Sequence, residues 1–364
     1  DWQENGVPVR QGTHVEWLRT GDVGGDSEMI FAWSDTRDGG RDIYAKKIDE
    51  SGNEFWNDEG LLIVSAPGRQ EDPILISDGN GGAYVMWKDY RDEPDDGDFY
   101  AQHVLADGSL AWDPLGVPLT TVPGKQVSPN MSGDGAGGAF CIWNDQSTGT
   151  GTFGHVYGTH LSPEGVLNPG VGIPLNTSGY EHSGVSIEIA APGSAMMVWS
   201  DNRNDSQYGN DIYAQRIDSN CVTLWSSHEE GGTLIYSGPG EQGHAKVTYY
   251  SDIASVIIWD DNRNDPDTED IYAQFVDMDG TILFASDGIA VSVSESRQYK
   301  PRVKANSLGA FVIWSDTRYN TQTPALNDIF MQKLTVEDGL AWDNEVEVTA
   351  EQSGDQTQAR LTTD

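Results

Sequence analysis

The sequence predicts an all-β protein, and within that class a β-propeller built from four-stranded antiparallel blades. Two observations carry this prediction. The signature W-x-D-x-R, a variable loop and D-I-Y-A-Q runs through six copies, one of them divergent, whose tryptophans recur at intervals of 54 to 60 residues. This period is typical of one blade per copy, since sandwich domains are longer and solenoid coils shorter. The tryptophans are Trp33, Trp87, Trp143, Trp199, Trp259 and Trp314.

The second copy shows the four expected strands in order. A short apolar run at residues 73–77 is followed by the turn Asp-Gly-Asn-Gly-Gly, whose glycines permit positive φ. Residues 83–88 form the second strand, and an acidic loop leads to the third at 98–105. A fourth segment spans 110–119, after another tight turn. No helical periodicity interrupts this pattern, which indicates antiparallel strands joined by short turns.

The same anatomy gives six complete repeats within a single domain over residues 1–364. Residues 2–9 match a fourth strand that precedes the first repeat, and residues 356–362 match a first strand that follows the last. A ring hides its edge strands by combining such half-repeats in one blade. We therefore expect six or seven blades, with seven slightly favoured and its remaining strands beyond residue 364. The approximate repeat bounds are 14–64, 72–120, 128–175, 184–236, 244–293 and 299–349.

The charge balance restricts the partners of the protein. The chain has 58 acidic and 21 basic residues, a formal net charge of -37. Such a surface repels nucleic acid and anionic membranes, and it serves either solubility or a cationic ligand. No apolar run approaches the ~18 residues of a membrane-spanning helix. The sequence predicts no nucleic-acid partner and no membrane insertion, and we expect the two cysteines, Cys141 and Cys221, not to pair.

The charged residues of the signature are predicted to form structural ion pairs at the tip of each hairpin. The third copy motivates this interpretation, because Ser147 and His155 replace the arginine and the second aspartate together, while Asp145 stays. Losing one partner alone would strand a partly buried charge. The alternative is that the signature aspartates bind a metal ion. The predicted pairs are Arg37 with Asp42, Arg91 with Asp98, Arg203 with Asp211, Arg263 with Asp270, and Arg318 with Asp328.

Two acidic loops are candidate Ca²⁺ sites. Their candidate ligands are Asp95 and Asp96 in the second copy, and Asp265 and Asp267 in the fifth. Ca²⁺ accepts several carboxylate oxygens from irregular loops. The alternative is an ordinary solvated acidic loop, since neither segment matches an EF-hand. No other cofactor is predicted.

The loops that join the second and third strands are the candidate binding face. They are the longest and most divergent parts of the chain, and such loops on a repeated scaffold usually carry binding. Aromatic residues on them, Tyr90, Phe153, Tyr208 and Tyr319, are candidate anchors for a sugar or a protein, unless they pack on their own blades. The loops are residues 35–42, 89–98, 145–155, 201–211, 261–270 and 316–328.

Evidence for catalysis is weak. The chain contains no G-x-S-x-G, H-E-x-x-H or P-loop motif. A glycosidase needs two carboxylates at a set separation, but among 58 acidic residues some pair always fits. No catalytic residue is named, and the sequence favours a non-enzymatic protein without excluding an enzyme.

The W-x-D-x-R and D-I-Y-A-Q repeats resemble those of a broad group of secreted bacterial propeller-like proteins, over residues 2–362 with the third copy departing. The resemblance implies a secreted or cell-surface setting and no particular chemistry. The leading hypothesis is an extracellular, non-enzymatic module that binds a glycan or a protein, or that assembles with itself. One alternative is a carbohydrate-active enzyme with a site at the mouth of the central channel. The other is a structural subunit joined to its neighbours through the terminal strands.

Overall fold

The computed structural model describes residues 9, 16–25, 28–147, 154–176, 180, 182–203, 209–225, 231–319, 327–349, 359 and 361. Over these residues the chain forms six antiparallel sheets and no helix, so the predicted all-β propeller of four-stranded blades is confirmed. The described residues accordingly include no helix that could span a membrane. Cys141 and Cys221 are both buried and unpaired with each other.

Each blade runs outward from its first strand to its fourth. In the first and sixth blades two short strands share the fourth position. The first blade contains β1 (Glu16–Gly25), β2 (Glu28–Asp35), β3 (Asp42–Asp49), β4 (Glu54–Phe55) and β5 (Leu61–Val64). The second contains β6 (Gln70–Ser77), β7 (Ala83–Asp89), β8 (Asp98–Val104) and β9 (Val117–Pro118). The third contains β10 (Gln126–Gly133), β11 (Ala139–Asp145), β12 (His155–Leu161) and β13 (Leu167–Pro174).

The remaining three blades repeat this order. The fourth contains β14 (His182–Ala191), β15 (Ser194–Asp201), β16 (Asp211–Asp218) and β17 (Thr233–Tyr236). The fifth contains β18 (Gln242–Ser251), β19 (Ala254–Asp265), β20 (Thr268–Asp277) and β21 (Ile289–Ser292). The sixth contains β22 (Gln298–Asn306), β23 (Gly309–Asp316), β24 (Asp328–Thr335), β25 (Gly339–Leu340) and β26 (Val346–Glu347).

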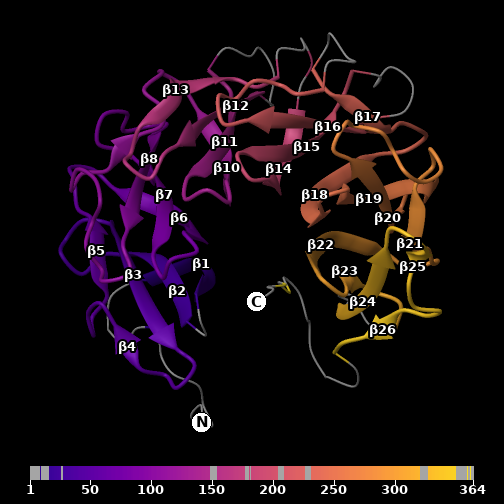
Figure 1. The fold of residues 1–364 in the computed structure, drawn as a ribbon, viewed down its shortest axis with the longest axis horizontal. Coiled ribbons are helices and arrows are strands. Elements are labelled where there is room, and N and C mark those ends of the chain that lie inside the picture. The colour runs from indigo at the N-terminus through magenta and orange to yellow at the C-terminus, as the bar shows by residue number, and fades with distance from the viewer. Residues whose placement is uncertain are drawn as a thin grey trace.

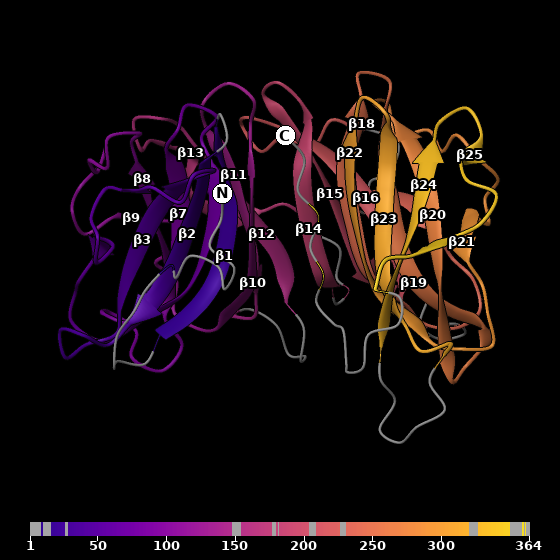
Figure 2. The same cartoon turned by 90° about the horizontal axis from the view of Figure 1, so that it is seen from below.

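The blades stand side by side in an arc (Figures 1 and 2). Their first strands lie innermost and neighbour one another in the order β1, β6, β10, β14, β18 and β22. In Figure 1 the first blade, in indigo, and the sixth, in yellow, stand on either side of an opening in the arc. The described residues thus supply six blades, and a seventh stays a prediction.

The core lies between the blades, because alternate residues of a strand face opposite neighbours. In the fifth blade Trp259 packs toward the fourth blade, in a cluster with Val198 and Ile212. The next residue back, Ile258, faces the sixth blade in a cluster with Val303 and Trp314. All six signature tryptophans are at most 2% exposed. From the second blade to the sixth, the repeated tryptophan therefore seals its blade against the preceding one.

Near the end of the described chain, Ala359 lies against the sixth blade. Ala359 lines a small cavity together with Ile313 and Ile329 of the sixth blade. These two isoleucines correspond in the repeat to Ile258 and Ile271, which pack on the sixth blade from the fifth. Ala359 therefore lies where the first strand of a further blade would pack. The rest of the predicted terminal strands, residues 2–9 and most of 356–362, falls outside the described residues.

Five of the inner strands carry a bulge at the same place. The pairing register between first and second strands shifts there in each case. The residue at the shift has a φ between 48° and 64°, a left-handed value that most side chains avoid. Because this unfavourable conformation recurs in five blades, the bulge is a regular feature of the first strand and not a local irregularity. The bulged residues are Asp72, Ser128, Gly184, His244 and Lys300.

Candidate functional site

The signature arginine binds the first aspartate of its own hairpin. In the second blade Arg91 Nη2 donates to Asp89 Oδ2 at 2.5 Å, and the Arg91 backbone N–H donates to Asp89 Oδ1 at 3.0 Å. Trp87 Nε1 donates to the same carboxylate at 2.9 Å. The Asp89 side chain is fully buried, and its carboxylate also accepts a hydrogen bond from Gln70 Nε2 of β6 at 3.3 Å. The equivalent ion pairs are Arg37 with Asp35, Arg203 with Asp201, Arg263 with Asp261, and Arg318 with Asp316.

The predicted pairing therefore named the wrong aspartate. Strand register places Asp89 directly opposite Asp98, so both carboxylates stand at the hairpin tip. The turn after Asp89 decides between them, because its i to i+2 hydrogen bond folds Arg91 back over its own strand. The arginine in each of the five blades makes its ion pair with the first aspartate, and not with the predicted partners Asp42, Asp98, Asp211, Asp270 and Asp328.

The same arginine also ties the outer part of the blade together. The Arg91 guanidinium stacks over the Tyr100 ring at 4.2 Å and donates to the Leu115 carbonyl at 2.9 Å. It thus joins the second strand, the third strand and the segment before the fourth. These roles are structural: the stacking repeats in the other blades with arginine, and Arg37 and Arg263 also donate to a backbone carbonyl before the fourth strand. The other stacked pairs are Arg37–Tyr44, Arg203–Tyr213, Arg263–Tyr272 and Arg318–Phe330.

In the first blade the two aspartates of the hairpin have pKa values shifted in opposite directions. Burial raises the pKa of Asp42, and the charges of Asp38 and Asp35 add to the rise. Burial likewise raises the pKa of Asp98 in the second blade, although Thr120 Oγ1 donates to it at 2.8 Å. Burial also favours the neutral form of Asp35, but hydrogen bonds from Arg37 outweigh it and lower the pKa of Asp35. A raised and a lowered carboxyl side by side would suit acid–base catalysis. Here both are buried and recur around the ring, which indicates a scaffold.

The third blade lacks this arrangement. The Ser147 backbone N–H donates to Asp145 Oδ1 at 2.9 Å, and the Ser147 hydroxyl donates to the same oxygen. The other oxygen, Asp145 Oδ2, is buried without a hydrogen-bond partner in the described structure, and so is Trp143 Nε1. The loss of the arginine therefore coincides with loss of the tryptophan–aspartate bond.

The predicted binding face is only partly as expected. Tyr90 is 8% exposed and lies beneath the Arg69 guanidinium at 3.4 Å, so it is not an exposed anchor. The sequence missed this because Arg69 comes from the connection between blades rather than from the hairpin. Tyr319 is 62% exposed, as an anchor requires, with its ring 5.8 Å from that of Phe330. Phe153 and Tyr208 lie outside the described residues.

The candidate calcium ligands do not gather in one place. Asp95, Asp265 and Asp267 are exposed and Asp96 is half-buried. Asp265 Oδ1 accepts the Asp267 backbone N–H at 2.9 Å, which is an ordinary turn interaction. Among the residues that the structure describes, no group of three or more His, Cys, Asp or Glu side chains could hold a metal ion. Calcium binding stays an untested prediction.

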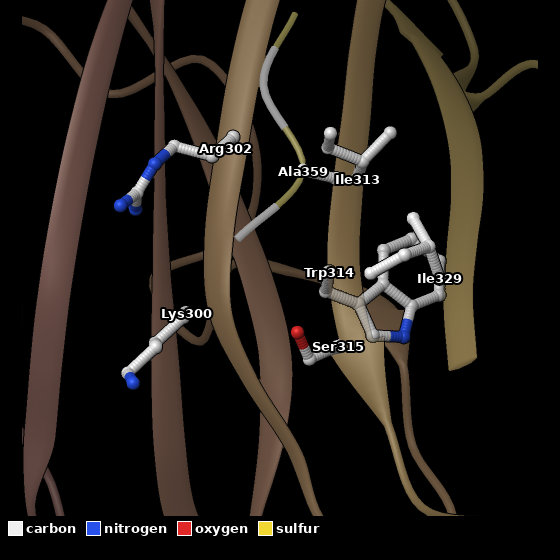
Figure 3. Close-up of a pocket in the computed structure, with 7 residues that line it drawn as sticks. All are labelled: Lys300, Arg302, Ile313, Trp314, Ser315, Ile329 and Ala359. Atoms are coloured by element: carbon white, nitrogen blue, oxygen red, sulfur yellow. The ribbon is translucent and has the colours of Figure 1, made fainter. Parts of the chain in front are cut away.

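The inner strands of the fifth and sixth blades carry a cluster of basic side chains that sequence reasoning missed. We call it the basic strip, and it consists of His244, Lys246, Lys300, Arg302 and Lys304. Figure 3 shows Lys300 and Arg302 on the side of β22 away from Trp314 and Ile329. The alternation K-x-R-x-K at residues 300–304 was the available signal, since alternate residues of a strand share a face.

Two carboxylates border the basic strip. Lys304 Nζ lies 2.7 Å from Glu188 Oε2 of β14, two blades away. Asp260 Oδ2 lies 2.8 Å from His244 Nδ1 and accepts the Lys300 backbone N–H at 3.0 Å. Lys246 is half-buried, and burial together with nearby Arg302 lowers the pKa of Lys246 to about 8. The strip thus holds like charges at close quarters inside a strongly acidic protein.

Comparison with known proteins adds little beyond the fold. No protein-family model matches the chain, and no curated protein matches it. A protein of unknown function from Dyadobacter fermentans is 12% identical, over 89% of this chain and 95% of that chain, with a TM-score of 0.48. An endo-arabinase from Bacteroides thetaiotaomicron is 14% identical, over 74% and 95%, with a TM-score of 0.41. An α-L-arabinanase from Penicillium chrysogenum is 14% identical, over 77% and 84%, with a TM-score of 0.41. Similarity at this level carries no argument about function.

Proposed function

We propose that the protein is an extracellular, non-enzymatic binding module that recognises a glycan or a protein with its hairpin loops. One observation carries the proposal. The shared residues of the signature are consumed by contacts within each blade, as Asp89, Arg91 and Tyr100 illustrate. What remains free to vary is the loop beyond each cluster, from residues 36–41 in the first blade to 317–327 in the sixth. Variable loops on a fixed base are a common basis of recognition.

Contacts between blades support a preorganised loop face. The Arg41 side chain of the first blade pairs with Glu71 of the second. The Arg297 guanidinium, at the start of the sixth blade, binds Glu269 of the fifth with its Nη2 at 2.8 Å from Oε1. Such ties hold a hairpin against the next blade, which lowers the entropy lost when a ligand binds.

Tyr319 gives the proposal a direct test. A glycan array and a pull-down from cell-surface extracts would identify the ligand, and Tyr319→Ala should weaken its binding about tenfold, as expected for an aromatic anchor. Leu308→Ala is the matched control, because Leu308 is 65% exposed at the opposite end of the same blade. No binding at high micromolar concentration, or equal loss in both variants, would contradict the proposal. Release of products from a panel of polysaccharides in the presence of calcium would instead favour the enzyme.

A second candidate function, assembly, is favoured by the position of Ala359. It lies against the outer side of the sixth blade, next to Ile313 and Ile329, where another strand can add to the stack. Figure 1 shows this blade beside the opening of the arc. Light scattering across a wide range of protein and calcium concentrations tests the idea. Assembly predicts a mass that rises with concentration, and a constant monomer mass would exclude it.

A further inference from the structure

The signature arginines all donate to the same oxygen of their aspartate. In each of the five blades with an arginine, the guanidinium donates to Oδ2 of the first aspartate, and the tryptophan Nε1 donates to that oxygen too. The other oxygen, Oδ1, accepts the backbone N–H of the arginine. One side of each carboxylate thus serves the turn, and the other serves a cation and an indole. These aspartates are Asp35, Asp89, Asp201, Asp261 and Asp316.

The third blade keeps this acceptor but has a serine in place of the cation. Asp145 Oδ1 still accepts the Ser147 backbone N–H, at 2.9 Å. The Asp145 residue is 1% exposed, and its Oδ2 has no hydrogen-bond partner among the described residues. The same is true of Trp143 Nε1. An unpaired buried carboxylate oxygen is unfavourable, and a cation placed against it would remove this penalty.

The third blade also keeps the second position that a guanidinium contacts. In the first, second and fifth blades the guanidinium donates to a carbonyl that lies one residue before a glycine packed against the signature tryptophan. Gly172 takes the place of this glycine in the third blade, since a Cβ on it would clash with the Trp143 ring. Val171 is therefore the residue equivalent to the carbonyl donors' partner. We call Trp143, Asp145 and Val171 the arginine slot.

Solvent reaches the third hairpin where the other blades carry their arginine. Ser147, at the arginine position, is exposed, and Tyr157 is half-buried. The ring beneath the guanidinium in the other five blades is at most 7% exposed. A group from outside can therefore approach the Asp145 carboxylate over Ser147, and the net charge of -37 attracts cations toward it. The rings compared with Tyr157 are Tyr44, Tyr100, Tyr213, Tyr272 and Phe330.

We propose that the arginine slot binds a guanidinium group supplied by another molecule, in the place that the other five blades fill with their own arginine. The guanidinium donates to Asp145 Oδ2 and to the carbonyl of Val171. Its planar fork reaches two acceptors at once, which an ammonium group does less well. The occupant is an arginine side chain of a protein partner, because the slot lies at the tip of a hairpin on the proposed binding face. The choice of a protein partner rests on the function proposed above, whereas the slot can be tested without it.

Titration of the full chain with ethylguanidinium at constant ionic strength tests the slot. The readout is the NMR signal of the indole N–H groups in protein that is isotope-labelled at tryptophan, and Trp143→Phe identifies the Trp143 signal. We expect this signal to shift and saturate, with a dissociation constant in the millimolar range for so small a ligand. The signature indoles of the five blades with an arginine are internal controls and should not shift, since their aspartates already hold a guanidinium.

Two variants separate the slot from general charge attraction. Asp145→Asn should weaken binding about tenfold or more, the effect of losing one charged hydrogen bond. Glu164→Gln is its matched control, because it removes one exposed carboxylate from the other end of the same blade and should change the affinity less than about twofold. Ser147→Arg should abolish binding, since the chain's own guanidinium then fills the slot. The proposal is overturned if the Trp143 signal does not shift, if Ser147→Arg still binds, or if ethylammonium binds as tightly as ethylguanidinium.

A pair of blocked tripeptides tests the protein partner. Gly-Arg-Gly should shift the Trp143 signal as ethylguanidinium does, and Gly-Lys-Gly should bind about tenfold more weakly. Binding of ethylguanidinium without binding of the arginine peptide would overturn the assignment to a protein. The two proposals fail in different ways: an empty slot leaves the effect of Tyr319→Ala on ligand binding unchanged, and a loop face without a ligand leaves ethylguanidinium binding unchanged.

Discussion

The second and third blades share one architecture but differ at the hairpin tip. In the second, Arg91, Asp89 and Trp87 form one hydrogen-bonded cluster. In the third, Ser147 takes the arginine position, and the buried Trp143 indole N–H has no hydrogen-bond partner among the described residues. The tryptophan still packs between blades in both. The tryptophan is thus buried whether or not the arginine is present, whereas its indole N–H bonds to the aspartate only in the blade that has the arginine.

Removal of the arginine should break the second blade most severely. Arg91→Ala leaves the buried Asp89 carboxylate without its cation, at a cost of about 3–5 kcal/mol in the free energy of unfolding. Chemical denaturation followed by tryptophan fluorescence measures the loss. Ser147→Ala in the third blade is the control and should cost about 1 kcal/mol. Similar losses in the two variants would mean that Arg91 contributes no more than a serine does.

The tryptophan N–H offers a finer comparison. Trp87→Phe and Trp143→Phe remove the same volume from equivalent positions, but only the first also breaks a bond to aspartate, which is 2.9 Å long. We expect Trp87→Phe to be the more destabilising by about 1–2 kcal/mol. The difference between the two denaturation midpoints measures this, and equal midpoints would show that the bond contributes nothing.

The third blade can be given the missing arginine. Ser147→Arg places a guanidinium next to the unpartnered Asp145 Oδ2, and Tyr157 already stands opposite Trp143 to stack beneath it. The variant should gain about 1 kcal/mol in stability. Paired with Asp145→Asn the gain should vanish. If the double variant is still more stable, the added stability does not come from an ion pair with Asp145.

The smallest expected effect concerns the second aspartate. Because the pKa of Asp98 is raised by burial, the folded state holds its proton more tightly than the unfolded state does. The ionised group therefore lowers stability as the pH rises above about 4. Asp98→Asn keeps an acceptor for Thr120 and should stabilise the protein by about 0.5–1 kcal/mol at pH 7. This gain in stability should disappear near pH 3, where Asp98 is protonated in both states. Denaturation curves of the variant and the parent at pH 7 and pH 3 measure it, and a variant that is less stable than the parent at pH 7 would contradict the prediction.

The repeat allowed the fold to be predicted, because the Trp87 and Trp143 positions recur at a period that only a few architectures have. The ion pairs could not be assigned, since Asp89 and Asp98 both stand at the hairpin tip and the following turn chooses between them. In the third blade the arginine and the second aspartate are both replaced, which suggested that these two residues pair. The suggestion was wrong, because the arginine of the other blades pairs with the first aspartate, and the third blade keeps that residue as Asp145. The basic strip stayed hidden until β18 and β22 were known to be neighbouring inner strands.

The five bulges have a consequence for the interior as a whole. They stand at equivalent points of successive strands, yet their side chains run from an acid at one end of the arc to a lysine at the other: Asp72, Ser128, Gly184, His244 and Lys300. The interior is therefore polarised from one side of the arc to the other, across the propeller axis rather than along it. A ligand that enters along the axis therefore meets an acidic side chain on one side and a lysine on the other. The blades share one architecture, but charge is distributed unequally around the space that they enclose.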